Sequence, residues 1–215
     1  MSDRFQNLKK IPEHPAARLL AHANAKIETK LKSPANASVP TVLAELEEAE
    51  AWVDLIRVLS VCLPPRECVW WSCIAAQDIV ASEDCKSTCL AAAEAWVFEP
   101  TEENRARLHT ILENESADDP AALAATAAFY APGTMGLGEM EEHAAPPGIV
   151  SACAFGTNLQ TLKLGPEPNV RFQLIIDRAL DIARGGNGKV ELPEPESEDD
   201  AENGSETAPK IEGTA

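Results

Sequence analysis

The sequence has few aromatic side chains and no long hydrophobic run. Aromatic residues account for 5% of the 215 residues, with a single Tyr, and no segment longer than a few residues alternates as a strand does. Sandwiches and barrels are rich in aromatic and β-branched residues, so the composition argues against them. No window approaches the roughly 18 continuous apolar residues of a membrane span, and the N-terminus lacks the apolar core of a signal peptide. We therefore expect a soluble, cytoplasmic protein without membrane insertion.

Basic residues are also scarce. Lys and Arg number 18 against 35 Asp and Glu, which gives a formal charge of −17. Nucleic acids bind through clustered basic side chains, so this chain is not expected to bind nucleic acid. A basic protein partner would be attracted, although acidity commonly serves solubility alone. Residues 187–215 carry nine carboxylates against two lysines. Such a stretch cannot bury enough apolar surface to fold, so we expect a disordered acidic tail there.

The rest of the sequence is rich in alanine and has the period of α-helices. With 45% apolar residues it is long enough for a domain with one core. Pro64 and Pro65 separate two of the predicted helices. We expect helices over residues 12–32, 41–63, 66–81, 84–98, 149–164 and 169–184, and two more that begin near Pro100 and Pro120. The predicted fold is all-α, a compact multi-helix bundle of antiparallel helices. Its parts are an N-terminal helix and linker (1–38), a helical domain (39–186) and the tail (187–215).

The segment 66–81 is apolar on nearly all sides. A helix without a polar face is normally central and buried, so we place in the core Trp70, Cys73, Ile74 and Val80. Trp70 and Trp71 point about 100° apart on a helix, so both cannot serve one contact. Of the two, Trp71 is the candidate to reach a groove or a partner, although a second core contact is the safer interpretation.

The cysteines do not form a recognisable redox or zinc motif, because no C-x-x-C pair is present. Cys85 and Cys89, one helical turn apart, could ligate zinc with Cys68 or Cys73 from the neighbouring helix. These cysteines alternate with alanine and isoleucine on apolar helices, so buried free thiols are favoured. None lies in a local signature with a histidine that would activate it as a nucleophile. No catalytic residue and no metal ligand is assigned.

Residues 132–147 are expected to form a loop, because Gly, Pro and Glu are frequent there. The glycines of residues 133–138 superficially resemble a phosphate loop, but no strand precedes them and no Lys-Ser/Thr pair follows. Residues 139–143 gather acids and an imidazole without the helical H-E-x-x-H spacing of a zinc site. We therefore expect no cofactor and no metal in this loop. The helix after Pro100 is charged, and solvent exposure is expected for His109 among its arginines, which include Arg105.

Four phrases of the sequence stand out together: Leu63-Pro64 with Glu67, Val69, Trp70 and Trp71; Ala95-Trp96-Val97 with Pro100 and Glu102-Glu103-Asn104-Arg105; Ala128-Phe129-Tyr130 with Gly133; and Pro146-Pro147. The set, over residues 39–184, resembles an uncharacterised family of bacterial helical proteins, a domain of unknown function. Some members are encoded near type VI secretion genes. The family more often has Trp where this chain has Tyr130, and Ser-Gly-Gly at residues 131–133. It brings no known catalytic residues, so none is carried over.

The resemblance implies a non-enzymatic accessory or adaptor protein of a bacterial secretion system, type VI in particular, that binds a protein component or cargo. Exposed aromatic residues and a Gly/Pro-rich loop suit protein recognition. We expect the partner to contact the tryptophan helix and the loop through Trp71, Phe129, Tyr130, Met135, Pro146 and Pro147. One alternative is an acidic immunity-type inhibitor that neutralises a basic toxin by charge complementarity. Another is an enzyme that uses Cys or Glu-His chemistry.

Overall fold

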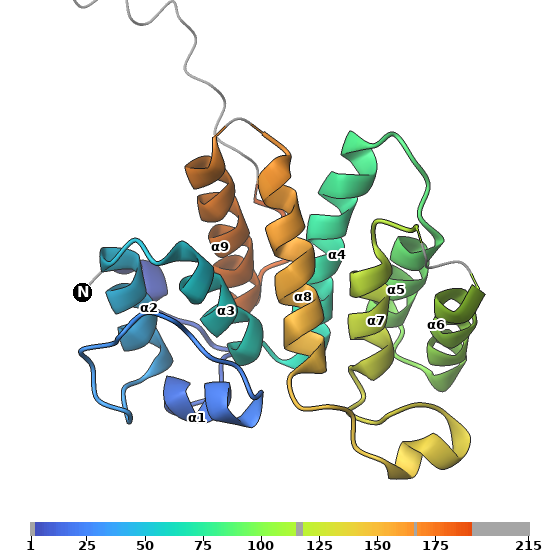
Figure 1. Cartoon of the computed structure of the whole chain (residues 1–215), viewed down its shortest axis with the longest axis horizontal. Helices are drawn as coiled ribbons and strands as arrows, with labels where there is room; N and C mark the ends of the chain where they lie inside the picture. The colour runs from blue at the N-terminus through green and yellow to red at the C-terminus, as the bar shows by residue number, and fades with distance from the viewer. Residues whose placement is uncertain (1–2, 115–117, 166, 191–215) are drawn as a thin grey trace, which may run out of the picture.

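The computed structural model describes residues 3–114, 118–165 and 167–190. Within these ranges the chain is built from helices joined by loops, without a β-strand, so the all-α prediction is confirmed (Figure 1). None of the described helices has both the length and the apolar character of a membrane span. The elements in chain order are η1 (Asp3–Phe5), α1 (Ala16–His22), α2 (Val39–Glu48), α3 (Trp52–Cys62), α4 (Pro65–Ser82), α5 (Thr88–Phe98), α6 (Glu102–Asn114), α7 (Ala122–Tyr130), η2 (Gly138–Glu142), α8 (Ile149–Gln160), η3 (Thr161–Lys163) and α9 (Pro168–Arg184).

The helix α4 lies between two hydrophobic clusters, which explains why it has no polar face. One side of α4, with Trp71 and Ile74, packs against α9 in a first core cluster to which α3 also contributes. The other side, with Cys73 and Ala76, packs in a second core cluster against α5 and α7. Helix α8 lies beside α4 and contacts both clusters (Figure 1). The prediction that residues 66–81 form a central helix is confirmed, and Pro65 is its first residue, as the Pro-Pro pair indicates. Cys73 and Ile74 are buried as predicted, but Trp70 and Val80 are only half-buried at the edge of the core.

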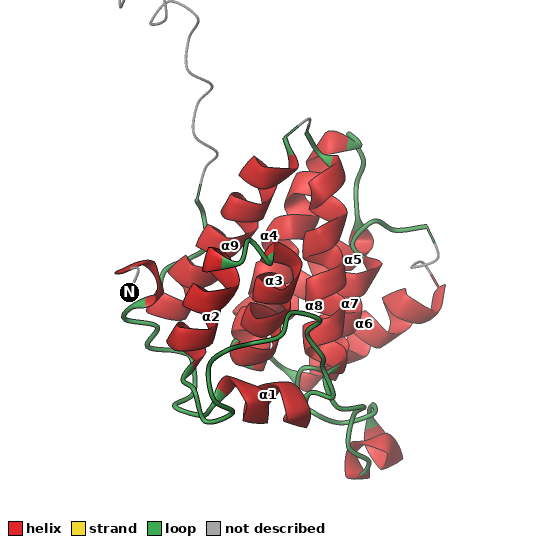
Figure 2. Ribbon diagram, turned by 60° about the vertical axis from the view of Figure 1, so that its left-hand side comes forward, coloured by secondary structure: helices red, strands yellow, loops and turns green. Residues whose placement is uncertain are grey.

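The prediction of a helix over residues 12–32 is wrong beyond α1, which covers Ala16–His22 only. Figures 1 and 2 show α1 below α2 and α3, followed by a long loop. Carboxylates on α2 and α3 accept hydrogen bonds from main-chain N–H groups of this loop. Asp54 accepts hydrogen bonds from the amides of Glu28 and Thr29 at 3.0 and 2.8 Å, and Glu45 accepts one from Ser33 at 3.0 Å. These bonds replace the helical ones, so the segment remains extended despite its helical spacing.

The predicted helix 41–63 is two helices, α2 and α3. The chain turns between them at Glu50, whose φ is 52°, a left-handed conformation that ends a helix. The turn allows α3 to pack on α2 rather than extend it. A similar left-handed residue, Asp84 with φ 47°, separates α4 from α5, so α5 begins at Thr88 instead of at the predicted residue 84.

The N-terminal segment belongs to the first core cluster. Phe5 is 1% exposed, and Ala16 and Leu20 are also buried in that cluster. Arg4 fixes the segment by ion pairs with Glu47 on α2 at 2.5 Å and with Asp177 on α9 at 2.6 Å. Residues 3–38 therefore complete the core of the helical domain.

The chain continues in a fixed path for six residues after α9. The indole N–H of Trp70 donates to the carbonyl of Asn187 at 2.7 Å, and Gly188 is buried. The first residues of the predicted disordered tail, 187–190, are thus packed on the domain. The rest of that prediction, for residues 191–215, lies outside the described residues.

Candidate functional site

The loop between α7 and α8, residues 131–148, has a defined base. We call it the anchored loop. Its two ends are joined in a short antiparallel bridge between Thr134 and Ala144. The amide of Met135 donates to His143 O at 2.8 Å, and the amide of Ala145 donates to Gly133 O at 3.0 Å. Most of the turn between them is η2, so the predicted loop contains local helical structure.

A buried arginine lies under the base of this loop. Arg105 on α6 is 1% exposed. Its Nε donates to Phe129 O at 3.0 Å, and its Nη2 donates to Thr134 O at 3.1 Å and to Thr134 Oγ1 at 2.7 Å. The guanidinium also lies 5.2 Å from the ring centroid of Phe129. Because the planar guanidinium presents several donors in a fixed fork, one side chain joins the last turn of α7 to the loop.

Burying a cation costs several kcal/mol unless its donors are satisfied. The nearest carboxylate, Glu102 Oε2, is 3.8 Å from Arg105 Nη1 and belongs to a side chain that is 63% exposed. The carbonyl oxygens of Phe129 and Thr134 therefore offset most of the cost of burying this charge. The conformation of the loop base and the position of Arg105 depend on each other, so α6 holds the loop in one arrangement.

Two polar side chains hold the end of α5: Asn104, which precedes Arg105 on α6, and Arg66 on α4. The side-chain amide of Asn104 donates to Glu99 O at 2.8 Å, and Arg66 Nε donates to Val97 O at 2.7 Å. Val97 O lies in the last turn of α5, where carbonyls have no partner within the helix, and Glu99 O lies just beyond it and also accepts from the amide of Thr101 at 2.8 Å. The Asn-Arg pair at residues 104–105 of α6 thus has a structural explanation, because Asn104 binds the end of α5 and Arg105 binds the base of the anchored loop.

The outer turn of the anchored loop presents acids and one hydrophobic side chain to solvent. We call residues 139–142 the acidic tip. Met140 is 44% exposed, and the flanking Glu139 and Glu141 are also exposed. A large hydrophobic side chain surrounded by carboxylates is a common arrangement at protein-binding surfaces, where an apolar contact is bordered by polar groups.

The predicted contact residues divide between the surface and the core. Pro146 and Pro147 are exposed at the end of the anchored loop, and Tyr130 and Met135 are half-buried beside its base. Phe129 is 5% exposed and packs against Tyr130, with ring centroids 5.0 Å apart. Four of the predicted residues therefore reach the surface around one loop, while Phe129 supports it from below.

Trp71 does not join this group. The prediction that it contacts a partner is wrong, and the alternative, a second core contact, is confirmed. Its exposure is 0%, and its indole N–H donates to Ile175 O on α9 at 3.1 Å. It faces the first core cluster, whereas Phe129 lies in the second. Trp70 is the half-buried member of the pair, and its ring lies 5.6 Å from that of Phe98, which is 70% exposed.

The cysteines are free and do not form a reactive centre. Five are buried, as predicted, and Cys85 is half-buried. Burial raises the pKa of Cys62 and of Cys68 to about 12 and that of Cys153 to about 11, so these groups remain neutral thiols at pH 7. In the part of the chain that the structure describes, no three His, Cys, Asp or Glu side chains come together to hold a metal ion.

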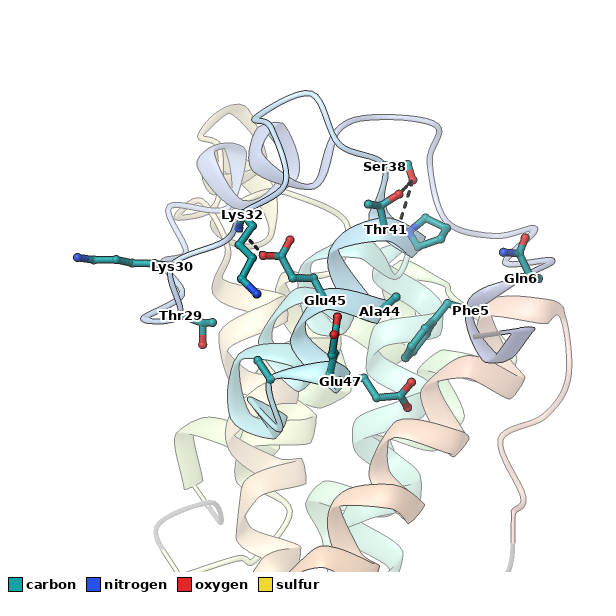
Figure 3. Close-up of a pocket in the computed structure, with 13 residues that line it drawn as sticks. Phe5, Gln6, Thr29, Lys30, Lys32, Ser38, Thr41, Ala44, Glu45 and Glu47 are labelled. Atoms are coloured by element: carbon teal, nitrogen blue, oxygen red, sulfur yellow. Dashed lines mark hydrogen bonds between the residues drawn. The ribbon is translucent and has the colours of Figure 1, made fainter. Parts of the chain in front are cut away.

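A groove of about 960 Å³ runs between the N-terminal segment and α2 (Figure 3). Sequence reasoning missed it because a helix was predicted over residues 12–32. Its carboxylates hold the N-terminal segment. Glu45 accepts from the amides of Lys32 and Ser33, and Glu47 pairs with Arg4. Figure 3 shows Lys30 pointing away from these groups. We assign this groove a structural role.

A model of a family of unknown function, DUF6931, matches residues 42–183. The chain belongs to this family. The match confirms the resemblance to an uncharacterised domain family. No curated protein and no solved structure matches the chain. The region that the DUF6931 model covers contains the anchored loop and Arg105, whereas most residues that line the groove on α2 precede it.

Proposed function

We propose that this DUF6931 protein is a non-enzymatic adaptor that binds a protein partner through its anchored loop. The anchoring of the loop by Arg105 carries the proposal. A fully buried guanidinium holds the base of a loop whose outer turn faces solvent. A loop that is held in one conformation before binding loses less conformational entropy when it binds. Such a fixed base is expected where the outer turn must present its side chains in a defined way.

The exposed side chains indicate the chemistry of the partner. Met140 supplies a flexible apolar contact that adapts to a hydrophobic pocket. The carboxylates of the acidic tip attract a basic rim around that pocket. We further propose that the partner is a component or cargo of a type VI secretion apparatus and that the adaptor acts in the cytoplasm. The support for this part of the proposal is the resemblance of the sequence to proteins that are encoded near type VI secretion genes.

Quantitative affinity capture from the native cells tests this proposal. The loop variant combines Met140→Ala with Glu141→Ala. A matched control combines Val170→Ala with Glu83→Ala, which also removes one exposed hydrophobic side chain and one exposed carboxylate, away from the loop. Both variants should retain the circular dichroism spectrum and the melting temperature of the wild type.

We expect the wild type and the control to recover the same secretion components or cargo, and the loop variant to recover at least about tenfold less. That ratio corresponds to the loss of about 1.4 kcal/mol of binding free energy. Equal recovery of those proteins by all three chains would contradict a role for the loop.

A second candidate function follows from the charge of the same surface. Glu139, Glu141 and Glu142 lie together on the acidic tip of a chain with a formal charge of −17. An inhibitor that neutralises a basic toxin would use this charge for rapid association. The association rate of the inhibitor would then fall steeply as salt is raised, and more steeply than that of an adaptor whose contact is centred on Met140 and only bordered by charges. Recovery of a single basic toxin with that salt dependence would favour the inhibitor.

A further inference from the structure

A basic cleft lies at the end of α4, between η3 and α9. It has a volume of about 620 Å³ and is lined by Lys163, Arg171, Arg178, Asp78 and Val190, together with small and apolar residues. Three cations and one carboxylate face this cleft, in a protein whose formal charge is −17. The net charge of the cleft is therefore positive, whereas that of the whole molecule is negative.

The carboxylate in the cleft is shared between two guanidinium groups. Asp78 Oδ2 is 2.7 Å from Arg178 Nη1 and 3.4 Å from Arg171 Nη1. Arg178 is 12% exposed, and its Nε is buried and has no hydrogen-bond partner among the described residues. Buried donors are normally paired. The cluster thus has one positive charge from these three groups, a further one from Lys163, and an unused donor.

The chain after α9 is directed back toward this cleft. It reverses at Gly185, whose φ is 103°, and the amide of Gly188 donates to Asp181 Oδ2 at 2.8 Å. Gly188 lies so close to the helices that an added Cβ would be 2.7 Å from Ile74 Cδ1, and its φ of 72° also favours glycine. Val190, the last described residue, lines the cleft itself.

The residue that follows Val190 is Glu191, the first of nine acidic residues up to residue 212. We propose that the basic cleft is a binding site for an acidic peptide, and that the acidic segment of this chain, from Glu191 onward, is its occupant. Arg178 already donates twice to Asp78, and Arg171 donates to Asp78 and to Leu164 O, so the segment is attracted by the net positive charge that remains in the cleft. Its carboxylates form charge-assisted hydrogen bonds with the exposed faces of these cations. This proposal is independent of the anchored loop, which lies elsewhere on the molecule.

Attachment of the acidic segment beside the cleft makes its binding an intramolecular event. A short connection gives an effective concentration on the order of 1 mM. If the free segment binds with a Kd of about 0.1 mM, the attached segment raises the apparent Kd of a competing peptide about tenfold. We therefore expect a competing acidic peptide to bind more weakly to the intact chain than to a chain without these acids.

Peptide binding to the full-length chain tests the proposal. The probe is a fluorescent peptide with the sequence of residues 191–202, and its anisotropy reports binding at low ionic strength. The host is the full chain with the seven acids of residues 191–202 changed to amides, which removes the internal competitor. We expect binding to this host, and binding to the wild-type chain that is about tenfold weaker.

Variants of the amide host locate the site. Arg171→Gln with Arg178→Gln should weaken peptide binding at least about tenfold, because both guanidinium groups lose their charge. Lys163→Gln, an exposed position outside the Asp78 cluster, should weaken it about threefold and serves if the double variant fails to fold. Arg107→Gln on α6 is the control that removes an equal charge elsewhere. Binding that Lys163→Gln and Arg107→Gln reduce equally, or binding of inorganic phosphate without the peptide, would overturn the proposal.

Discussion

Replacing Arg105 by Met removes the donors that hold the anchored loop while it keeps an unbranched side chain of similar length. Phe129 O and Thr134 O both lose their donor, as does the hydroxyl of Thr134. An unsatisfied buried acceptor costs about 1–3 kcal/mol. Because Thr134 is half-buried and water reaches it more easily, we expect a total loss of about 3 kcal/mol. For a domain of this size that corresponds to a fall in the melting temperature of about 6–12 °C.

Thermal unfolding followed by circular dichroism measures this difference. Arg107→Met is the matched control, because Arg107 lies two residues further along α6 and is exposed. It should change the free energy of unfolding by less than about 0.5 kcal/mol. Hydrogen exchange adds a local readout, since the amides of Met135 and Ala145 close the loop base and should exchange at least about tenfold faster in Arg105→Met. The reasoning about the anchor is refuted if Arg105→Met has the same melting temperature as Arg107→Met and the amides of Met135 and Ala145 exchange no faster in it.

Three further predictions concern the core, a turn and the thiols. Trp71→Ala should lower the free energy of unfolding by about 3–5 kcal/mol in denaturant titration, whereas Phe98→Ala, at an exposed site, should change it by less than about 1 kcal/mol. Gly148→Ala should destabilise the chain by more than about 2 kcal/mol, because its Cβ would lie 2.0 Å from a main-chain oxygen, while Gly133→Ala, in open space with φ 90°, should cost only about 1–2 kcal/mol in the same titration. Alkylation at pH 8 followed by mass spectrometry should modify Cys85 first. The raised pKa values of Cys62 and Cys68 also predict how the free energy of unfolding depends on pH. Their contribution is fully present below about pH 9 and is lost as the pH rises toward 12, because these thiols lose their protons in the unfolded chain at a lower pH than in the folded one.

The helices were predictable where the signal is local. Pro64 and Pro65 ended one helix and began the next, and Gly185 ended α9, because proline and glycine act on the backbone at their own position. The segment after α1 was not predictable in this way. Its amides bind Asp54 and Glu45, which are distant in sequence, so a helical spacing of apolar residues was overridden by tertiary hydrogen bonds.

The orientation of the two tryptophans could not be read from the pattern. An amphipathic helix reveals its buried face, but α4 is apolar all round because core clusters lie on both of its sides. The pattern therefore did not distinguish the two, and the prediction that Trp70 is the more buried of the pair is the reverse of the structure. The partner of each indole N–H, Asn187 O or Ile175 O, lies more than a hundred residues away.

The candidate site was predictable as a loop but not as an anchored one. The Gly and Pro content located residues 132–147, and the exposed prolines were expected. Arg105 was missed because it lies among charged residues, where exposure is the ordinary expectation. A signal was present: Arg105, Leu108 and Ile111 follow each other at intervals of three, on the buried face of α6. An arginine on such a stripe needs buried acceptors, and here the loop supplies them.

A photo-crosslinking residue at Met140 tests the central claim most directly. It places the reactive group on the acidic tip, and the same residue at Val170, which has a similar exposure, is the control. Irradiation of the native cells should give one discrete adduct with a protein partner from Met140 and none of that mass from Val170. The absence of any adduct at Met140, or the same adducts at both positions, would contradict the assignment of the anchored loop as the binding surface.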